Sequence, residues 1–378
     1  MKYLHFFFLL QSAVANAVTL PTPNGPFSVG LFTTALSDTS RMDPYAPADA
    51  PRLRKLMVSV FMPMDNATSQ CVPELVPYMT PLVAADYDIL AMSAGLPNGT
   101  FSELNMKLCK SLPLAGCARG RRDIRRAAQI SRPLLLFSPG FGQSRLVYNA
   151  MAQSLASEGY IVASIDHPYD ANVVEYPDGS YVTAANISSD DIAALNALLD
   201  APLRRVIGHS GNVINFEKLV MYGHSLGGAT AATLMLTDSR IRGGINLDGR
   251  FFDKVLATGV SAPFINVGRP NHRLEDTTWD SFYNISTGPI IELEVSGSLH
   301  AAFTDFPAVI GTMNLTNVDV IETVQAFVGT IPWERAGDII TRVVTDSAEF
   351  VFDHRNSTVL SGTDSSFPEV ELVRGHGY

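Results

Sequence analysis

From residue 133 onward, short apolar runs alternate with amphipathic stretches. Runs of this length, bounded by polar residues or by Gly and Pro, predict buried strands. They occur at 134–137, 161–165, 218–222, 243–247, 263–268 and 289–295. Helical patterns occur near 144–158, around 189–207, from Ser225 onward and over 317–352. Strands that alternate with helices are typical of a mainly parallel central sheet with helices on both faces.

The first third of the chain has a different pattern. Residues 26–36 and 53–62 predict two early strands. The stretch 63–130 is interrupted by prolines, has little strand character and contains all of the cysteines, so we predict an insertion that covers one side of the core. No internal repeat and no linker rich in Gly, Ser or Pro divides the chain, which predicts a single domain over 18–378. The final Gly-containing tail is expected to be loose.

Residues 1–17 have the organisation of a secretory signal peptide. Lys2 provides the positive start, residues 6–10 form an apolar core, and Ala15-Asn16-Ala17 offers small residues for cleavage. Asn-x-Ser/Thr sequons follow at Asn66, Asn98, Asn186, Asn284, Asn314 and Asn356. Sequons are acceptors for N-glycosylation on the surface of secreted proteins. The sequence therefore predicts a secreted, extracellular glycoprotein.

The cysteines are Cys71, Cys109 and Cys117. In an oxidising compartment one pair forms a disulfide and one thiol remains. The sequence does not choose the pair. No two of them have a CxxC spacing, so neither a redox motif nor a zinc site is predicted.

Composition narrows the classes of partner. The chain has 378 residues, of which 46% are apolar and 17% charged, and its formal net charge is −10. An average domain carries about 25% charged residues, so this chain is poor in charge and long enough to bury a large core. The acidic balance argues against nucleic acid as a partner. No apolar run reaches the roughly 20 residues of a membrane-spanning helix.

The candidate chemistry centres on Ser225. Gly223, Ser225 and Gly227 form a Gly-x-Ser-x-Gly motif between the strand 218–222 and a helix of small residues. This context predicts the nucleophile elbow of the α/β-hydrolase fold, in which flanking glycines let the chain turn tightly around an exposed serine hydroxyl.

In this fold the catalytic acid and base follow the nucleophile in chain order. Asp248 ends the strand 243–247, at the sheet edge where ligands of open sheets bind. The rival carboxylates are Asp253, Glu275 and Asp276. We predict Asp248 as the acid.

For the base, His300 lies on a loop after the strand 289–295, at the same sheet edge. His272 lies in a polar loop that comes too early in the chain for the base. His354 and His376 lie in later sequence that is expected to be less ordered. We therefore predict His300.

Two backbone N–H groups should stabilise the oxyanion. One is expected from Leu226, the residue after the nucleophile, and the other from the loop 138–142, at Phe141. His167, Tyr169 and Asp170 follow a strand end and are candidate pocket residues, with capping of their own loop as the alternative.

These blocks resemble those of a known family. The oxyanion loop 136–142, the serine segment 223–228, Asn246-Leu247-Asp248-Gly249 and the histidine segment 298–306 look like the matching segments of the platelet-activating-factor acetylhydrolases of the lipoprotein-associated phospholipase A2 type, in particular their fungal relatives. The resemblance covers roughly 130–305 and supports Asp248 as the acid. Pro139 stands where the family commonly has a histidine, and 63–130 has little that matches.

The resemblance implies a serine ester hydrolase that cleaves short acyl esters of glycerophospholipids through an acyl-enzyme, without metal or cofactor. The alternative is a general secreted carboxylesterase or a cutinase-like polyesterase with the same triad. An inactive binding protein of this fold and a serine peptidase are rival classes. Apolar side chains in 72–96 predict either the packed core of the insertion, which we favour, or a lid or lipid-facing surface: Leu75, Tyr78, Met79, Leu82, Leu90 and Met92.

Overall fold

The computed structural model describes residues 18–64, 71–109, 131–185 and 214–378. Several sequence-based predictions concern residues outside these ranges. They are the signal peptide, the helix around 189–207, the sequons at Asn66 and Asn186, and any role of Cys117.

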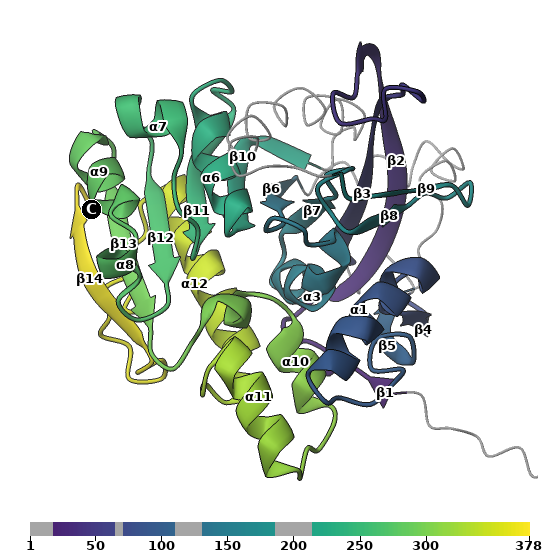
Figure 1. Cartoon of the computed structure of the whole chain (residues 1–378). Helices are drawn as coiled ribbons and strands as arrows, with labels where there is room; N and C mark the ends of the chain where they lie inside the picture. The colour runs from purple at the N-terminus through teal and green to yellow at the C-terminus, as the bar shows by residue number, and fades with distance from the viewer. Residues whose placement is uncertain (1–17, 65–70, 110–130, 186–213) are drawn as a thin grey trace, which may run out of the picture.

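A twelve-stranded mixed sheet runs through the molecule (Figure 1). Its strand order is β1-β5-β2-β3-β7-β6-β10-β11-β12-β13-β14, and β4 pairs with β5 outside this path. The strands are β1 (Val18–Thr19), β2 (Ser28–Met42), β3 (Leu53–Met64), β4 (Pro73–Pro77), β5 (Leu104–Cys109), β6 (Arg132–Ser138), β7 (Ile161–Ile165), β10 (Ile214–His224), β11 (Ile241–Leu247), β12 (Phe264–Gly268), β13 (Ile290–Val295) and β14 (Val370–His376). A separate hairpin consists of β8 (Val173–Glu175) and β9 (Tyr181–Thr183).

The middle of this sheet is parallel from β7 through β6, β10, β11 and β12 to β13. These are the six strands predicted from the apolar runs, and β7 has the predicted bounds. Because parallel strands all end at the same edge, the loops after β6, β10, β11, β12 and β13 meet there. The predicted site residues lie in or directly after these strand ends.

Helices cover both faces of the sheet, as predicted (Figure 1). Side chains of a strand alternate between faces, so Leu135 and Phe137 join one apolar cluster and Leu134 and Leu136 join the other. Buried side chains from α1, α3, α10, α11 and α12 belong to the first cluster, and those from α6, α7 and α9 to the second.

The bounds of these elements follow. The helices are α1 (Pro81–Ser93), α3 (Asn149–Ser157), α6 (Leu226–Met235), α7 (Asp253–Thr258), α8 (His272–Glu275), α9 (Thr278–Ile285), α10 (Phe306–Gly311), α11 (Val318–Val328) and α12 (Trp333–Asp353), with short 3-10 turns η2 (Arg145–Tyr148) and η4 (His300–Phe303). Among the described residues, no helix combines the length and the apolar character required to cross a membrane.

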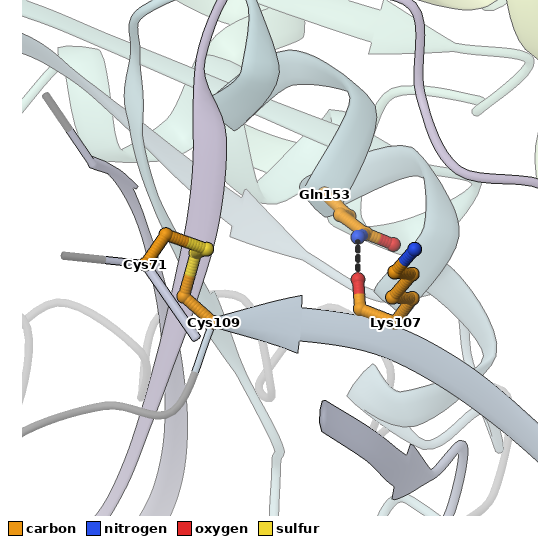
Figure 2. Close-up of a disulfide and its surroundings, with 4 residues drawn as sticks. All are labelled: Cys71, Lys107, Cys109 and Gln153. Carbon is orange, nitrogen blue, oxygen red and sulfur yellow. Dashed lines mark hydrogen bonds between the residues drawn. A yellow bond between two sulfur atoms is a disulfide. The ribbon is translucent and has the colours of Figure 1, made fainter. Parts of the chain in front are cut away.

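The insertion has more strand structure than predicted. Within its described part, β4 and β5 pair with each other and extend the main sheet, while α1 packs beside them (Figure 1). Cys71 and Cys109 form a disulfide that joins the start of β4 to the end of β5 (Figure 2). Gln153 of α3 donates a hydrogen bond of 2.7 Å to the carbonyl of Lys107 and so connects β5 to this helix (Figure 2).

The C-terminal tail is not loose, contrary to the sequence-based expectation. Residues 370–376 form β14, which pairs antiparallel with β13 and is the last strand at one edge of the sheet. The Arg374 guanidinium donates to the buried Glu292 carboxylate at 2.8 Å. A tail with weak apolar alternation is therefore ordered by backbone pairing and by an ion pair that the local sequence pattern does not reveal.

Candidate active site

Ser225 occupies a tight turn between β10 and α6. Its φ of 54° and ψ of −120° lie in a region that is strained for any residue with a side chain. Gly227 and Gly223 make this turn feasible: a Cβ atom on Gly227 would lie 1.9 Å from the Ser138 carbonyl oxygen, and one on Gly223 would lie 2.2 Å from the Gly227 carbonyl carbon. The sequence motif therefore folds into a compact strand–turn–helix elbow.

Asp248 lies directly after β11 and is almost completely buried. Its φ of 58° is also left-handed. The Asn246 side chain holds this turn, because its oxygen accepts from the Gly249 N–H at 2.9 Å and its amide donates to the Gly249 carbonyl at 2.7 Å. A Cβ on Gly249 would lie 1.9 Å from the Ser225 carbonyl oxygen, so the acid turn packs directly on the elbow.

His300 begins η4, after β13, and its Nδ1 lies 2.6 Å from Asp248 Oδ2. Its side chain is 47% exposed, so the far side of the imidazole is accessible to a substrate. The buried His224 supports it from below. His224 Nε2 lies 3.0 Å from the His300 carbonyl oxygen, and its Nδ1 lies 2.8 Å from the Tyr148 hydroxyl.

The protonation of His224 follows from its surroundings. Burial and the neighbouring His300 lower its pKa to about 3. A neutral His224 donates a hydrogen bond from Nε2 to the His300 carbonyl and accepts one at Nδ1 from the Tyr148 hydroxyl. It is thus a neutral link that fixes the backbone of His300.

The loop after β6 approaches the elbow from the other side. A Cβ on Gly140 would lie 3.2 Å from Ser225 Cβ. Leu226 is the first residue of α6, so its N–H has no acceptor within the helix. Gly140, the residue before Phe141, therefore packs against Ser225. Among the residues that the structure describes, neither the Phe141 N–H nor the Leu226 N–H has a backbone acceptor.

The segment after β7 anchors this loop at both ends. His167 Nε2 lies 2.9 Å from Ser138 Oγ, Asp170 Oδ1 accepts from the Gly142 N–H at 3.0 Å, and the Asn172 N–H donates to the Gly142 carbonyl at 3.2 Å. Burial lowers the pKa of His167 to about 4 and raises that of Asp170 to about 7. His167 therefore supports the loop from a buried position.

Tyr169, the third candidate pocket residue, lies elsewhere. Its φ is 69° and its buried ring belongs to a small separate cluster with Met57, Val174 and Tyr176. The structure does not bring this side chain together with the residues around Ser225.

Asp248 has two further partners that the sequence analysis passed over. His272 Nδ1 lies 2.7 Å from Asp248 Oδ1, and Arg269 donates from its backbone N–H to Oδ1 at 2.9 Å and from a guanidinium nitrogen to Oδ2 at 2.8 Å. Burial would raise the pKa of Asp248, but the hydrogen bonds from His272 and His300 hold it well below its usual range. Asp248 is therefore a carboxylate throughout the neutral range.

A sequence signal for these partners existed. Arg269 and His272 follow β12, the strand beside β11, so their loop ends at the same sheet edge as Asp248. From its chain position alone, His272 was not expected to be the base, and no contact between it and the acid was predicted.

The rival residues have other surroundings. Glu275 pairs with the Arg269 guanidinium, Asp276 lies 3.5 Å from His272, and Asp253 begins α7. His354 ends α12 and His376 ends β14.

Two further observations concern the geometry of this site. Within the described residues, Ser225 Oγ makes no hydrogen bond to the His300 ring, although such catalytic contacts often shorten only when substrate binds. The described residues also contain no group of three or more His, Cys, Asp or Glu side chains arranged to hold a metal ion.

Comparisons with known proteins identify the family and the fold of the chain. The family model "Platelet-activating factor acetylhydrolase, isoform II" matches residues 106–182 and 196–330, more than half of the chain. A probable 1-alkyl-2-acetylglycerophosphocholine esterase from Arthroderma benhamiae is 29% identical over 96% of both chains. The platelet-activating factor acetylhydrolase of Canis lupus familiaris is 27% identical over 46% of this chain and 48% of its own.

A solved structure is similar over nearly the whole fold. The ferulic acid esterase from Streptomyces cinnamoneus superimposes with a TM-score of 0.75 at 27% sequence identity, covering 95% of this chain and 100% of that one. The fold is therefore that of the α/β-hydrolases, and the chain is an ester hydrolase that belongs to the platelet-activating factor acetylhydrolase, isoform II family.

Proposed function

We propose that this chain is a secreted serine esterase in which Ser225, Asp248 and His300 form the catalytic triad. The observation that carries the proposal is the contact of 2.6 Å between His300 Nδ1 and Asp248 Oδ2, beside a serine held in a strained elbow. This is the arrangement in which a buried carboxylate fixes the tautomer of a histidine base. On this proposal, residues 18–378 act as one hydrolase domain.

The mechanism follows from the placement of these groups. His300 Nε2 takes the Ser225 proton as the oxygen attacks the ester carbonyl, and Asp248 stabilises the imidazolium that forms. The N–H groups of Phe141 and Leu226 donate to the developing oxyanion. His300 then protonates the leaving alcohol, and water attacks the acyl-enzyme with the same groups in reversed roles.

The substrate we propose is a glycerophospholipid with an acetyl or other short acyl group. Support comes from the fungal relative, which aligns over 96% of both chains and whose name describes an alkyl-acetylglycerophosphocholine esterase. A second candidate is an esterase of simple or aromatic carboxylic esters, which the similarity to the ferulic acid esterase favours.

A lipid surface is part of the first candidate. Of the six apolar side chains singled out in 72–96, Tyr78 and Met79 are buried in the core. The other four are exposed on β4 and α1: Leu75, Leu82, Leu90 and Met92. Because side chains that packed only in the core would not be exposed, we propose that these four contact the lipid surface that carries the substrate.

Secretion is proposed from the leader and from surface features. The sequons at Asn98, Asn284, Asn314 and Asn356 have exposed asparagines, and a disulfide of this kind persists in oxidising compartments. Enzymatic deglycosylation of protein expressed by secretion should lower its mass, whereas an unchanged mass would contradict the use of these sequons.

The catalytic assignment is tested with a fluorophosphonate probe, which reacts with activated serines. The wild-type enzyme should be labelled and Ser225→Ala should not, with an unchanged melting temperature. Labelling of Ser225→Ala at the wild-type rate would exclude the assignment. A panel of acetyl-phospholipid, long-chain phospholipid, p-nitrophenyl ester, feruloyl ester and polyester then separates the two candidate functions by kcat/KM.

A further inference from the structure

Asp248 is held by more groups than the proposed mechanism uses. His300 occupies one side of Oδ2, while His272 and the backbone N–H of Arg269 both reach Oδ1, at 2.7 and 2.9 Å. The Arg269 guanidinium also donates to Oδ2 at 2.8 Å. None of the contacts from Arg269 and His272 takes part in moving the Ser225 proton, so their role needs a separate explanation.

The hydrogen-bond pattern assigns the protons of His272. An ionised carboxylate only accepts, so the nitrogen facing Asp248 Oδ1 carries a proton. The Arg269 guanidinium lies 2.8 Å from this same nitrogen. With that proton in place, both groups donate to Asp248, and the charge of Arg269 opposes a charge on His272, so any protonation of the ring has to come from the carboxylates that face it.

The second nitrogen of His272 faces another carboxylate. Nε2 lies 3.5 Å from Asp276 Oδ2, and within the described residues both of these atoms are buried without a hydrogen-bond partner. A proton on Nε2 would give each of them the partner it lacks. An imidazolium therefore fits between Asp248 and Asp276 better than a neutral ring does.

Packing around His272 also suits a cation. The ring is 4% exposed, and the Trp279 ring lies over it with a centroid distance of 4.3 Å. Aromatic faces attract cations. Burial would lower the pKa of His272, but its hydrogen bond to Asp248 and the Asp276 carboxylate that faces its second nitrogen raise it to about 9. The Trp279 indole N–H is itself fixed by a bond of 2.7 Å to the Gly249 carbonyl in the acid turn.

We propose that His272, assisted by Arg269, is a positioning residue that fixes Asp248 as an anion in the rotamer that serves His300. The inference rests on the proposed function, because it takes Ser225, Asp248 and His300 as the triad. His272 and the Arg269 backbone occupy Oδ1, and this division leaves Oδ2 directed at His300. Without them, a carboxylate with one mobile partner could rotate away from the base.

The arrangement also affects pH dependence. The groups that face Asp248 and His272 are His300 from η4, Arg269 directly after β12, Glu275 from α8 and Asp276 directly after it. The neutral His224 of β10 lies beside His300, with the two rings tilted and their centroids 4.5 Å apart. A positive charge on His272 opposes the appearance of a second charge on His300. Removal of the His272 charge should therefore move the acidic limb of the activity profile to higher pH.

Two substitutions separate hydrogen bonding from charge. His272→Asn keeps an amide donor near the position of Nδ1 but carries no charge, and His272→Leu removes both. The matched control is His354→Asn, because His354 is exposed at the end of α12 with a φ of 51° that asparagine adopts readily. The readouts are kcat and KM for p-nitrophenyl acetate across the histidine titration range, the rate of fluorophosphonate labelling, and the melting temperature.

We expect His272→Leu to lower kcat about 10–100-fold with little change in KM, the size typical of losing a hydrogen bond to a charged group. His272→Asn should keep kcat within about fivefold of wild type and move the acidic limb of kcat/KM up by about 0.5–1 pH unit. His354→Asn should change neither quantity. Arg269→Gln provides an independent variant if the His272 substitutions do not fold, and it should lower kcat about 5–10-fold and move the limb in the same direction.

The result that would overturn the inference is a wild-type kcat and a wild-type acidic limb in folded His272 and Arg269 variants. A loss of activity that merely follows the folded fraction, with an unchanged pH profile, would also overturn it, since that outcome indicates a structural role. The proposed function fails by a different result, namely labelling of Ser225→Ala at the wild-type rate.

Discussion

Two buried aspartates support different parts of the candidate site, and their pKa values are shifted in opposite directions. Asp170 supports the oxyanion loop and Asp248 supports the base, and each is no more than 3% exposed. Burial raises the pKa of Asp170 to about 7, whereas the hydrogen bonds to Asp248 overcome burial and hold its pKa well below the usual range. Equal burial therefore does not dictate equal ionisation.

The difference lies in the donors. Within the described ranges Asp170 receives one hydrogen bond, from the Gly142 N–H, and the nearby Asp166 carboxylate opposes its ionisation. Asp248 receives bonds from His300, His272 and Arg269, of which Arg269 carries a permanent charge. One side of the site thus relies on backbone hydrogen bonds around a carboxyl group whose ionisation is opposed, and the other relies on a charged network. Substitutions should affect the two sides in different ways.

The largest expected effect concerns the charged side. Asp248→Asn should lower kcat/KM about 10⁴-fold, because an amide in this position stabilises the wrong tautomer of the base and no longer neutralises the imidazolium. The measurement is steady-state hydrolysis of p-nitrophenyl acetate. Asp170→Asn serves as the matched control, and equal losses in the two variants would contradict the contrast between the two aspartates.

An intermediate effect should appear in the pH dependence of stability. The folded-state pKa of Asp170 is raised above its reference value of 3.8 to about 7, so the folded protein binds more protons in this window and stability falls as pH rises through it. The loss contributed by Asp170 is about 1–4 kcal/mol at pH 8. Denaturant unfolding of Asp170→Asn should show a smaller loss between pH 4 and 7, and curves parallel to those of wild type would exclude this effect.

The smallest expected effect concerns the support that Asp170 gives to the oxyanion loop. Asp170→Leu leaves the Gly142 N–H without an acceptor, which should displace the oxyanion loop and lower kcat about 10-fold. Asp170→Asn keeps an acceptor oxygen and should stay within about threefold of wild type. Equal losses of kcat in Asp170→Leu and Asp170→Asn would contradict a role of Asp170 as the acceptor for the Gly142 N–H.

Much of the fold could be predicted from local sequence. Apolar runs predicted the six parallel strands, and the glycines around Ser225 predicted the elbow. Both predictions were possible because side-chain burial in a strand and the steric limits of a turn are set by a few neighbouring residues. The elbow in the structure has those glycines against backbone atoms of the Ser138 loop and of its own turn. The tail that forms β14 was not predicted, since its order depends on pairing with β13, about 80 residues earlier in the chain.

The sequence by itself determined the fold class, the family blocks and the residues proposed for the triad, because motifs and chain order carry these. Only the tertiary structure decided that Cys71 pairs with Cys109 and that His272 and Arg269 gather on Asp248. Which loops meet depends on the lateral order of the strands. Adjacent parallel strands bring residues 20 or more positions apart to one edge, and no local pattern records that neighbourhood.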